Sequence, residues 1–226
     1  KRGNDYRKRI ILFMEIISLA YNRPDFIELQ YNSVMKWFKN PTYIVYDNSN
    51  DSLIADECKR LRINRTQIQV DKVEKDISGN VAKILREIWK DHHENCIIMD
   101  SDMFFTGEFK LEEDMMYVPH YTNNKEWVWP NFMAFRKIEN PEELDFGFFP
   151  IDGIHCDVGS ATNYYLRKYK PKVKHIEREV FSEYFFDRLS IDGKPFLLHY
   201  KCSSNYASEC TPEYIRLKTD AMLKLL

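Results

Sequence analysis

Glycine loops that bind phosphate are missing from this sequence. It has 7 glycines among 226 residues, and neither a Gly-x-Gly-x-x-Gly nor a Gly-Lys-Ser/Thr segment occurs. Any phosphate that the protein binds must therefore be held by other means, such as a metal ion. Apolar runs long enough to span a bilayer are missing as well, and the first residues, Lys1 to Asp5, are not those of a signal peptide.

Cysteines are few and show no pairing pattern. The five cysteines are odd in number, and no Cys-x-x-Cys spacing occurs. Reduced thiols in a cytosol-like compartment fit this usage better than a disulfide framework or a structural zinc site, so we expect a cytoplasmic protein. Because the chain begins with Lys1 rather than Met, an N-terminal anchor or another domain removed from it remains an open alternative.

The sequence also lacks a strong charge of either sign. A net charge of -2 and a pI of about 6.4 exclude the basic footprint of a nucleic-acid-binding protein, and we interpret the basic run at 168–174 as a solvated face. Hydrophobic residues make up 44% of the chain and aromatic residues 15%. This content is enough to bury one sizeable core, so we predict a single domain over residues 1–226.

Strand-like and helix-like segments alternate through the first half. Apolar runs predict strands at 10–13, 16–19, 43–46, 68–70 and from 96 onward, and apolar spacing predicts helices near 25–38, 51–62 and 81–89. This alternation predicts an α/β fold with a mostly parallel sheet. In the second half we predict short aromatic strands at 115–119, 129–135 and 146–150, a helix over 161–169 and a strand over 195–200.

Two carboxylates follow the apolar run that begins at Cys96. Asp100 and Asp102 are two residues apart, and on an extended chain they would face the same side at the carboxyl end of a strand. Two converging carboxylates repel each other, so a divalent cation with oxygen ligands is expected beside them. A solvated turn is the alternative, which the aromatic Phe104 and Phe105 disfavour.

Six short motifs occur in a fixed order along the chain. They are Ser18-Leu19-Ala20-Tyr21-Asn22-Arg23-Pro24, Val45-Tyr46-Asp47-Asn48-Ser49, Asp100-Ser101-Asp102, Trp129-Pro130-Asn131-Phe132-Met133-Ala134-Phe135, Asp157-Val158-Gly159-Ser160 and His199-Tyr200-Lys201-Cys202-Ser203-Ser204-Asn205. Over most of the chain they resemble the nucleotide-sugar-dependent glycosyltransferases of the GT-A fold. The compact, aromatic-rich build is also similar to the small glycosyltransferases of large DNA viruses of algae, which implies the host cytoplasm.

The resemblance implies a fold and a reaction. It implies a GT-A domain with a Rossmann-like nucleotide-binding half at about 8–105 and an acceptor-binding half at about 106–226. The implied reaction moves a sugar from a nucleoside-diphosphate sugar, with a UDP-sugar favoured, to a hydroxyl of a glycan or glycoprotein. No nucleic-acid partner and no membrane span of the chain are expected. A bound Mn²⁺ or Mg²⁺ would stabilise the departing diphosphate.

The resemblance also implies roles for single residues. These are nucleotide contacts by Ala20, Tyr21, Asn22, Arg23 and Asp47, metal ligation by Asp100, Asp102 and His199, donor contacts by Asp100 and Ser101, diphosphate contacts by Lys201, Ser204 and Asn205, and acceptor contacts by Trp129 and Asn131. An imidazole ligand favours Mn²⁺. The sequence departs from the family at Ser203-Ser204, where a glycine is common.

An inverting transfer needs a base near the acceptor hydroxyl. Asp157 is the first candidate because it precedes a predicted helix, and Asp152 is the second. Each of these residues also has a purely structural alternative. Asp157 would be a helix cap, His199 a structural histidine, and Lys201 a surface lysine. The aromatic Trp127, Trp129, Tyr121 and Phe132 suit a sugar-stacking site or simply the core.

Two other functions remain as alternatives. A phosphatase of the Asp-x-Asp type also places two carboxylates after a strand, with the first as nucleophile. Such enzymes carry the motif in the first strand and a Thr or Val where this chain has Phe104, which argues against this class. The second alternative is a non-catalytic module that binds a nucleotide-sugar on the same fold.

Overall fold

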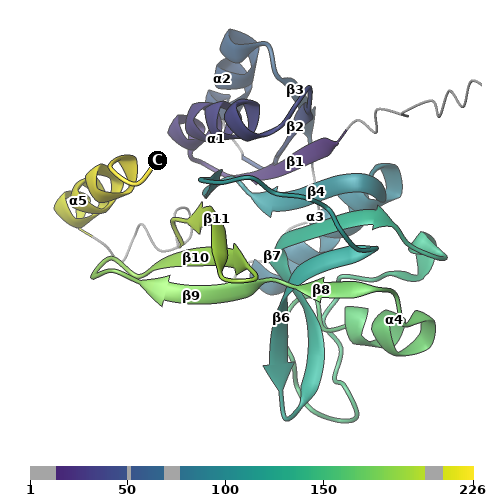
Figure 1. The fold of residues 1–226 in the computed structure, drawn as a ribbon. Coiled ribbons are helices and arrows are strands. Elements are labelled where there is room, and N and C mark those ends of the chain that lie inside the picture. The colour runs from purple at the N-terminus through teal and green to yellow at the C-terminus, as the bar shows by residue number, and fades with distance from the viewer. Residues whose placement is uncertain (1–13, 50–51, 69–76, 202–210) are drawn as a thin grey trace, which may run out of the picture.

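The computed structural model describes residues 14–49, 52–68, 77–201 and 211–226, and it contains two sheets (Figure 1). The larger, seven-stranded sheet has the order β3 (Asn64–Gln67), β2 (Thr42–Asp47), β1 (Glu15–Ala20), β4 (Glu94–Asp100), β7 (Lys125–Lys137), β6 (Met115–Thr122), β8 (Val173–His175). The four-stranded sheet has the order β5 (Met103–Phe105), β11 (Lys194–His199), β10 (Phe186–Ile191), β9 (Glu177–Phe181). The α/β fold class predicted from the sequence is confirmed.

The first half supplies the parallel part of the larger sheet. Strands β3, β2, β1 and β4 run parallel, and Leu19 of β1 lies opposite both Tyr46 of β2 and Asp100 of β4. The carboxyl ends of these strands therefore share one edge. Strand β7 is antiparallel to β4 and β6, and the smaller sheet is antiparallel throughout.

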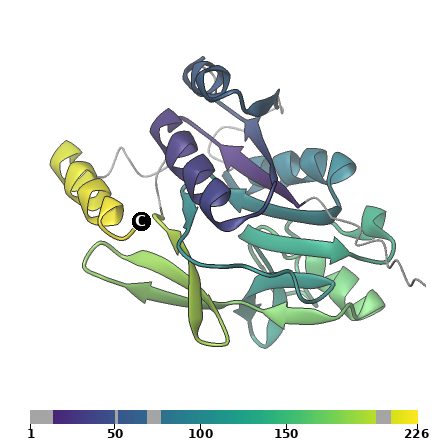
Figure 2. The same ribbon diagram turned by 45° about the horizontal axis from the view of Figure 1, so that its top comes forward.

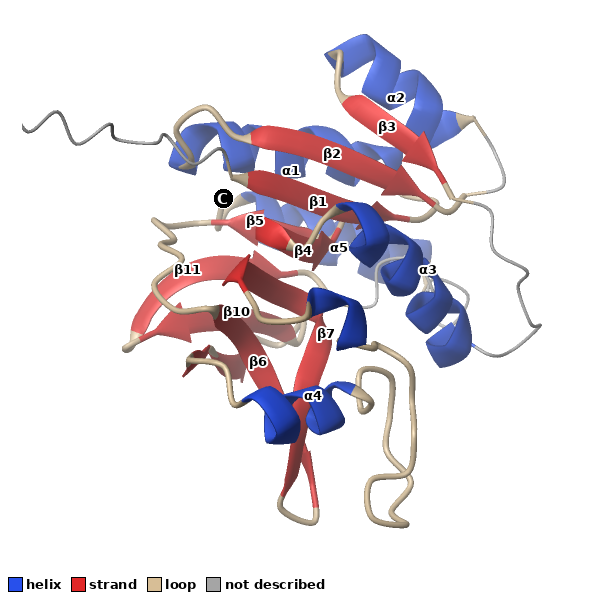
Figure 3. Ribbon diagram, turned by 90° about the vertical axis from the view of Figure 1, so that its right-hand side faces the viewer, coloured by secondary structure: helices blue, strands red, loops and turns tan. Residues whose placement is uncertain are grey.

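Helices cover both faces of the larger sheet (Figure 3). Helices α1 (Pro24–Trp37) and α2 (Leu53–Leu61) pack on one face, where Ile27, Val34 and Ile54 join a core that also includes Phe196 and Leu197 of the smaller sheet. Helices α3 (Ile77–Asp91) and α4 (Thr162–Tyr169) pack on the opposite face. None of the helices in the described ranges combines the length and apolar character needed to cross a membrane.

Two predicted strands differ from the described structure. Strand β3 lies at Asn64–Gln67 instead of 68–70, because this edge strand is built from polar residues and its neighbour Ile68 carried the apolar signal. Residues 69 and 70 lie outside the described residues, as does the predicted strand at 10–13. The run at 146–150 is a loop in which Phe146 is buried against Trp89, with 5.4 Å between ring centroids, and Phe148 and Phe149 are exposed.

The second half of the chain contains elements that the sequence did not predict. Strands β8, β9 and β10 and helix α5 (Pro212–Leu223) are among them, together with a short 3₁₀ helix at Pro141–Glu143. Helix α5 lies at the end of the molecule where β9 and β10 meet, as Figure 2 shows, and the Tyr184 and Tyr214 ring centroids are 5.9 Å apart. On its inner side Met222 is fully buried in a cluster with Phe26, Phe104 and Tyr200.

Candidate metal centre

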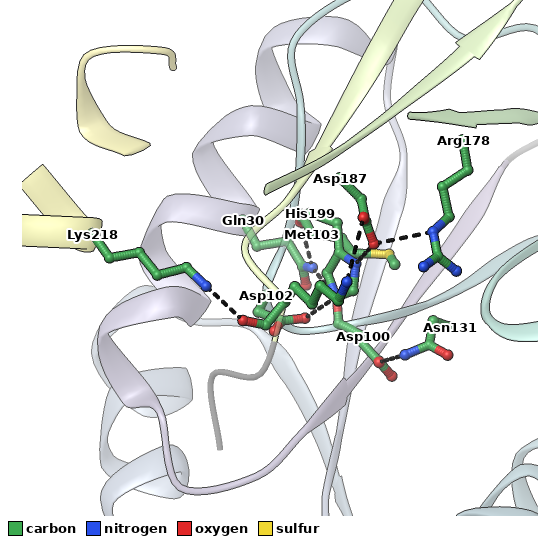
Figure 4. Close-up of polar contacts among 10 residues, drawn as sticks. Gln30, Asp100, Asp102, Met103, Asn131, Arg178, Asp187, His199 and Lys218 are labelled. Atoms are coloured by element: carbon green, nitrogen blue, oxygen red, sulfur yellow. Dashed lines mark hydrogen bonds and ion pairs between the residues drawn. The ribbon is translucent and has the colours of Figure 1, made fainter. Parts of the chain in front are cut away.

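Asp100, Asp102 and His199 come together where the two sheets meet (Figure 4). One ligand atom from each of these residues lies within 4.8 Å of the others. Asp100 ends β4, Asp102 lies in the turn before β5, and His199 ends β11, which pairs with β5 so that His199 is opposite Met103. The sequence predicted these three ligands, and the structure places them in one cluster.

A buried glutamine from α1 holds the turn that carries the two carboxylates. Gln30 Nε2 donates hydrogen bonds of 2.8 Å to the backbone carbonyls of both Asp100 and Met103, and Gln30 Oε1 accepts one of 2.6 Å from Tyr43. The Ser101 amide also donates to the Leu19 carbonyl, over 3.0 Å. Both ends of the turn are thus tied to β1 and α1.

Sequence reasoning missed Gln30, although the chain contains a signal for it. Gln30 lies on the face of α1 that carries the buried Phe26, Ile27 and Val34, and it is itself fully buried. A polar side chain in an apolar helix stripe must find hydrogen-bond partners inside the protein. Such a residue therefore predicts a buried polar partner, although the sequence does not say which one.

His199 is held between two carboxylates. Its Nδ1 is 3.1 Å from Asp187 Oδ2 and its Nε2 is 3.3 Å from Asp102 Oδ1, and both aspartates are almost fully buried. Burial opposes the charged imidazolium, but Asp102 and Asp187 outweigh it and raise the pKa of His199 to about 9. When neutral with its proton on Nδ1, the ring donates to Asp187 and leaves Nε2 for a metal.

Asp187 was also missed from the sequence. It lies on β10 opposite His199 in the antiparallel register, and the contact depends on a hairpin that the sequence did not predict. Burial opposes ionisation of Asp187, but His199 and Arg178 outweigh it and lower its pKa, and Arg178 Nε lies 3.2 Å away. Asp187 is therefore a carboxylate that fixes the orientation of the imidazole.

The electrostatics of Asp100 favour a bound cation. Burial and the neighbouring Asp102 charge raise the pKa of Asp100 to about 7, although Asn131 Nδ2 donates a 2.5 Å hydrogen bond to its Oδ2. Two carboxylates this close are more stable when a cation neutralises part of their charge. Asn131, which is expected at the acceptor, thus contacts a candidate metal ligand.

The spacing of the donor atoms fits a small divalent ion. Two ligands at right angles, each at about 2.1 Å from one ion, lie about 3.0 Å apart. Asp102 Oδ1 and His199 Nε2 are separated by 3.3 Å. Two carboxylates and one imidazole suit Mn²⁺, and the hard oxygen ligands also suit Mg²⁺. The residues therefore fit the expected metal.

Aromatic and basic groups border the cluster. The Trp129 ring is buried, its centroid is 5.6 Å from that of His199, and the Arg178 guanidinium lies over it at 4.6 Å. Lys201 Nζ is 3.9 Å from Asp187 Oδ1, and its side chain is about one-third exposed. Trp129 is thus beside the candidate ligand His199, and Lys201 is beside the Asp187 carboxylate that orients it. Ser204 and Asn205, expected at the diphosphate, lie outside the described residues.

The predicted nucleotide loop lies at the same edge of the sheet. Asn22, after the buried Ala20 and half-buried Tyr21, donates its amide to Ser49 Oγ over 3.0 Å. Asp47 is buried, accepts from the Ser49 amide and pairs with Arg65 at 2.7 Å. Both Asp47 oxygens are thus engaged in ordering the loop.

Arg23 presents a cationic surface at this loop. Its guanidinium lies over the Phe26 ring at 3.6 Å, 5.6 Å from the Tyr200 ring, and pairs with Asp25 at 2.7 Å. Burial opposes the charge of Arg23, but Asp25 and Tyr200 outweigh it and raise its pKa. The guanidinium therefore remains charged while it is partly covered by aromatic rings.

The two candidate bases lie outside the metal-ligand cluster. Asp157 is exposed, and its Oδ1 accepts a 2.7 Å hydrogen bond from the Val158 amide. Ala161 occupies the N-cap position of α4, so Asp157 is not its N-cap. Asp152 is exposed and forms ion pairs with Lys125 at 2.7 Å and Arg167 at 3.3 Å, which lower its pKa.

Comparisons with known proteins give structural similarities only. No protein-family model matches the sequence, and no curated protein matches it. Similar solved structures include S. aureus TarS 1-349, with 14% identity and a TM-score of 0.48 over 82% of this chain and 60% of that chain. The glycosyltransferase GlyE of Streptococcus pneumoniae TIGR4 has 9% identity and a TM-score of 0.45 over 73% and 45%.

A third similar structure is the mannosyltransferase PcManGT from Pyrobaculum calidifontis, which was solved with GDP-Man and Mn²⁺. It shares 13% identity with this chain and has a TM-score of 0.38, over 54% of this chain and 44% of that chain. The present chain therefore spans 60% of the first of these proteins and less than half of the other two.

Proposed function

We propose that this protein is a metal-dependent glycosyltransferase that uses a nucleoside-diphosphate sugar, with a UDP-sugar favoured. The observation that carries the proposal is the cluster of Asp100, Asp102 and His199, whose donor atoms lie within 4.8 Å of one another. The cluster lies where a parallel α/β sheet presents the carboxyl ends of its strands, which is the usual place for a ligand in such folds. The sequence resemblance to GT-A glycosyltransferases supplies the reaction class.

Residues around the metal site would have separate roles in the reaction. A bound Mn²⁺ or Mg²⁺ would act as a Lewis acid on the departing diphosphate. Asp100, Asp102 and His199 would hold the ion, and Asp187 orients His199 through its Nδ1. Arg23 and Lys201 add positive charge near the site, where it favours an anionic leaving group.

The choice of base follows from the environments of the two candidates. Asp152 is engaged by two cations that lower its pKa, which makes it a weaker base. Asp157 is exposed and lies before α4, in the segment that resembles a catalytic-site segment of the GT-A glycosyltransferases. We therefore assign the base of an inverting transfer to Asp157. Acceptor binding is assigned to the face around Trp129 and Asn131, with a hydroxyl of a glycan or glycoprotein as the acceptor.

The wider setting of the proposal comes from the sequence. We propose one domain over residues 1–226 that acts in the cytoplasm, with a nucleotide-binding half at about 8–105 and an acceptor-binding half at about 106–226. The narrower similarity to viral glycosyltransferases has no support in the comparisons, and the proposal does not include it.

Thermal unfolding with nucleoside diphosphates tests the proposal. We expect UDP with Mn²⁺ to raise the unfolding midpoint of the wild-type protein, since ligands that bind only the folded state stabilise it. Asp102→Asn should abolish that increase. Asp192→Asn, at an exposed carboxylate that pairs with Lys174, is the matched control and should retain it. If neither UDP nor GDP stabilises the wild type with Mn²⁺ or Mg²⁺, the proposal is wrong.

Hydrolysis of the sugar donor separates an enzyme from a binding module. Without an acceptor, a glycosyltransferase commonly transfers the sugar slowly to water, so UDP should accumulate from a UDP-sugar. We expect this release to require Mn²⁺ and to disappear in Asp102→Ala. Binding of the donor without any release, even with acceptor glycans present, would support the non-catalytic module instead.

A further inference from the structure

A buried lysine from the last helix lies beside the metal-ligand candidates. Lys218 of α5 is only 7% exposed. A buried ammonium is costly unless anionic or polar groups compensate its charge. Its Nζ donates a 3.0 Å hydrogen bond to the Lys201 carbonyl and lies 4.5 Å from the centre of the Tyr200 ring. These contacts place the ammonium next to the strand end that carries His199.

The same ammonium is directed at Asp102. Figure 4 shows the Lys218 side chain extending from α5 toward the Asp102 carboxylate. Tyr200 links the two residues. Its amide donates a 2.9 Å hydrogen bond to the Asp102 carbonyl, and the Lys218 ammonium lies over its ring. Asp102 is 5% exposed and His199 lies beside it at 3.3 Å, so an ammonium directed at Asp102 adds to the compensation of its buried charge.

The packing of α5 fixes the position of this lysine. Met222 lies one turn after Lys218 on the same face and is fully buried, whereas Arg216 and Asp220 are exposed and pair with each other at 3.2 Å. The Tyr200 hydroxyl contacts the Ile215 carbonyl at 3.4 Å. Lys218 therefore occupies an inward position that an apolar residue would normally take.

We propose that the Lys218 ammonium is a permanent positive charge of the donor site, the place where the metal ion and the nucleoside diphosphate bind. Before a divalent ion binds, its ammonium neutralises Asp102; once the ion binds Asp102, the ammonium binds the diphosphate of the nucleotide. This inference rests on the proposed function. A nucleoside diphosphate carries more negative charge than one divalent ion neutralises, so a second cation within reach of Asp102 is suited to the excess.

Lys218→Gln tests both parts of the proposal because they change binding in opposite directions. The substitution removes the charge and keeps a donor for the Lys201 carbonyl. Titration of Mn²⁺ alone, followed by calorimetry, should show binding about threefold to tenfold tighter than in the wild type, because a competing cation is gone. Titration of UDP at saturating Mn²⁺ should show binding about tenfold weaker, since one charge-assisted contact is lost.

Control variants and a shorter nucleotide define the interpretation. Arg216→Gln removes a positive charge from the exposed face of the same helix and should change neither affinity. Lys218→Arg should restore most of the UDP affinity. UMP, which lacks the second phosphate, should lose less affinity than UDP in Lys218→Gln. Thermal unfolding of each variant confirms that it is folded. If Lys218→Gln does not fold, Lys218→Met takes its place in the titrations.

The possible failures can be told apart. If the wild type binds Mn²⁺ and UDP but Lys218→Gln binds both with wild-type affinity, Lys218 has no role in the donor site and only this inference is wrong. If the wild type binds neither Mn²⁺ nor UDP nor GDP, the proposed function itself is wrong. An equal loss of Mn²⁺ and UDP binding in Lys218→Gln would indicate a purely structural lysine and would also overturn the inference.

Discussion

His199 shows how neighbouring side chains prepare a residue for metal binding. Its Nδ1 contacts Asp187 and its Nε2 faces Asp102, so one nitrogen is used for orientation and the other is directed to the site. The negative neighbours that orient the ring also favour its protonation. A divalent ion must displace that proton, which makes metal binding depend on pH.

We predict that Mn²⁺ stabilises the protein more at pH 9 than at pH 6.5. The raised pKa of His199, about 9, means that its charged form stabilises the metal-free protein below pH 6.5, and this contribution is lost as pH rises through 9. Asp100, with a pKa raised to about 7, also binds a proton more tightly than a free carboxyl does. Both protons compete with the metal at lower pH.

Thermal unfolding with and without Mn²⁺ at several pH values measures this effect. The increase in midpoint should grow from pH 6.5 to pH 9, and His199→Gln should weaken both the increase and its pH dependence. His155→Gln, at an exposed histidine, is the control. A Mn²⁺ effect that is the same at every pH would contradict the assignment of His199 as a ligand.

The turn between β4 and β5 is the element on which the site depends. The sequence correctly predicted that Asp100 and Asp102 belong to one site, but for an incomplete reason. Alternation along one extended strand does not bring them together, because Ser101 and Asp102 form a turn and β5 then pairs in the other sheet. Hydrogen bonds from Gln30, a residue 70 positions away from Asp100, hold that turn.

We predict that Gln30→Leu destabilises the fold and the metal site together. The substitution keeps the size of the side chain but leaves the Asp100 and Met103 carbonyls and the Tyr43 hydroxyl without their partner. Unsatisfied buried polar groups cost about 1–3 kcal/mol each, so with three such groups a loss of at least about 3 kcal/mol is expected.

Denaturant unfolding and Mn²⁺ titration measure the two consequences. Glu28→Ala on the same helix removes only an exposed ion pair with Arg60 and should cost less than about 1 kcal/mol, without any effect on Mn²⁺ binding. If Gln30→Leu behaves like Glu28→Ala, the turn does not depend on the glutamine.

Across the whole molecule, the sequence predicted the parallel half of the larger sheet better than the rest. Buried runs such as Ile16–Leu19 are strong strand signals, whereas β9 consists largely of exposed charged residues and β3 of polar ones. Asp187 became visible only when β10 was paired with β11. Local pattern thus predicted the carboxylates and the imidazole, but the contacts that orient them depend on long-range pairing.

Helix α5 connects the stability of the whole molecule to the donor site. Met222 is fully buried with Phe26 of α1, Phe104 of β5 and Phe186 of β10, so one side chain joins elements from across the molecule. Its neighbour Leu223 is 48% exposed. The pair therefore offers two truncations at adjacent positions with very different burial.

We predict that Met222→Ala lowers the free energy of unfolding by about 2–5 kcal/mol, because it leaves a cavity in this cluster. Loosening α5 should also misplace Lys218, so UDP binding at saturating Mn²⁺ should weaken even where the variant is fully folded. Leu223→Ala should lower the unfolding free energy by less than about 1 kcal/mol and leave UDP binding unchanged. Denaturant unfolding and calorimetry measure both quantities. If Met222→Ala loses stability but keeps the wild-type UDP affinity, α5 stabilises the fold without shaping the donor site.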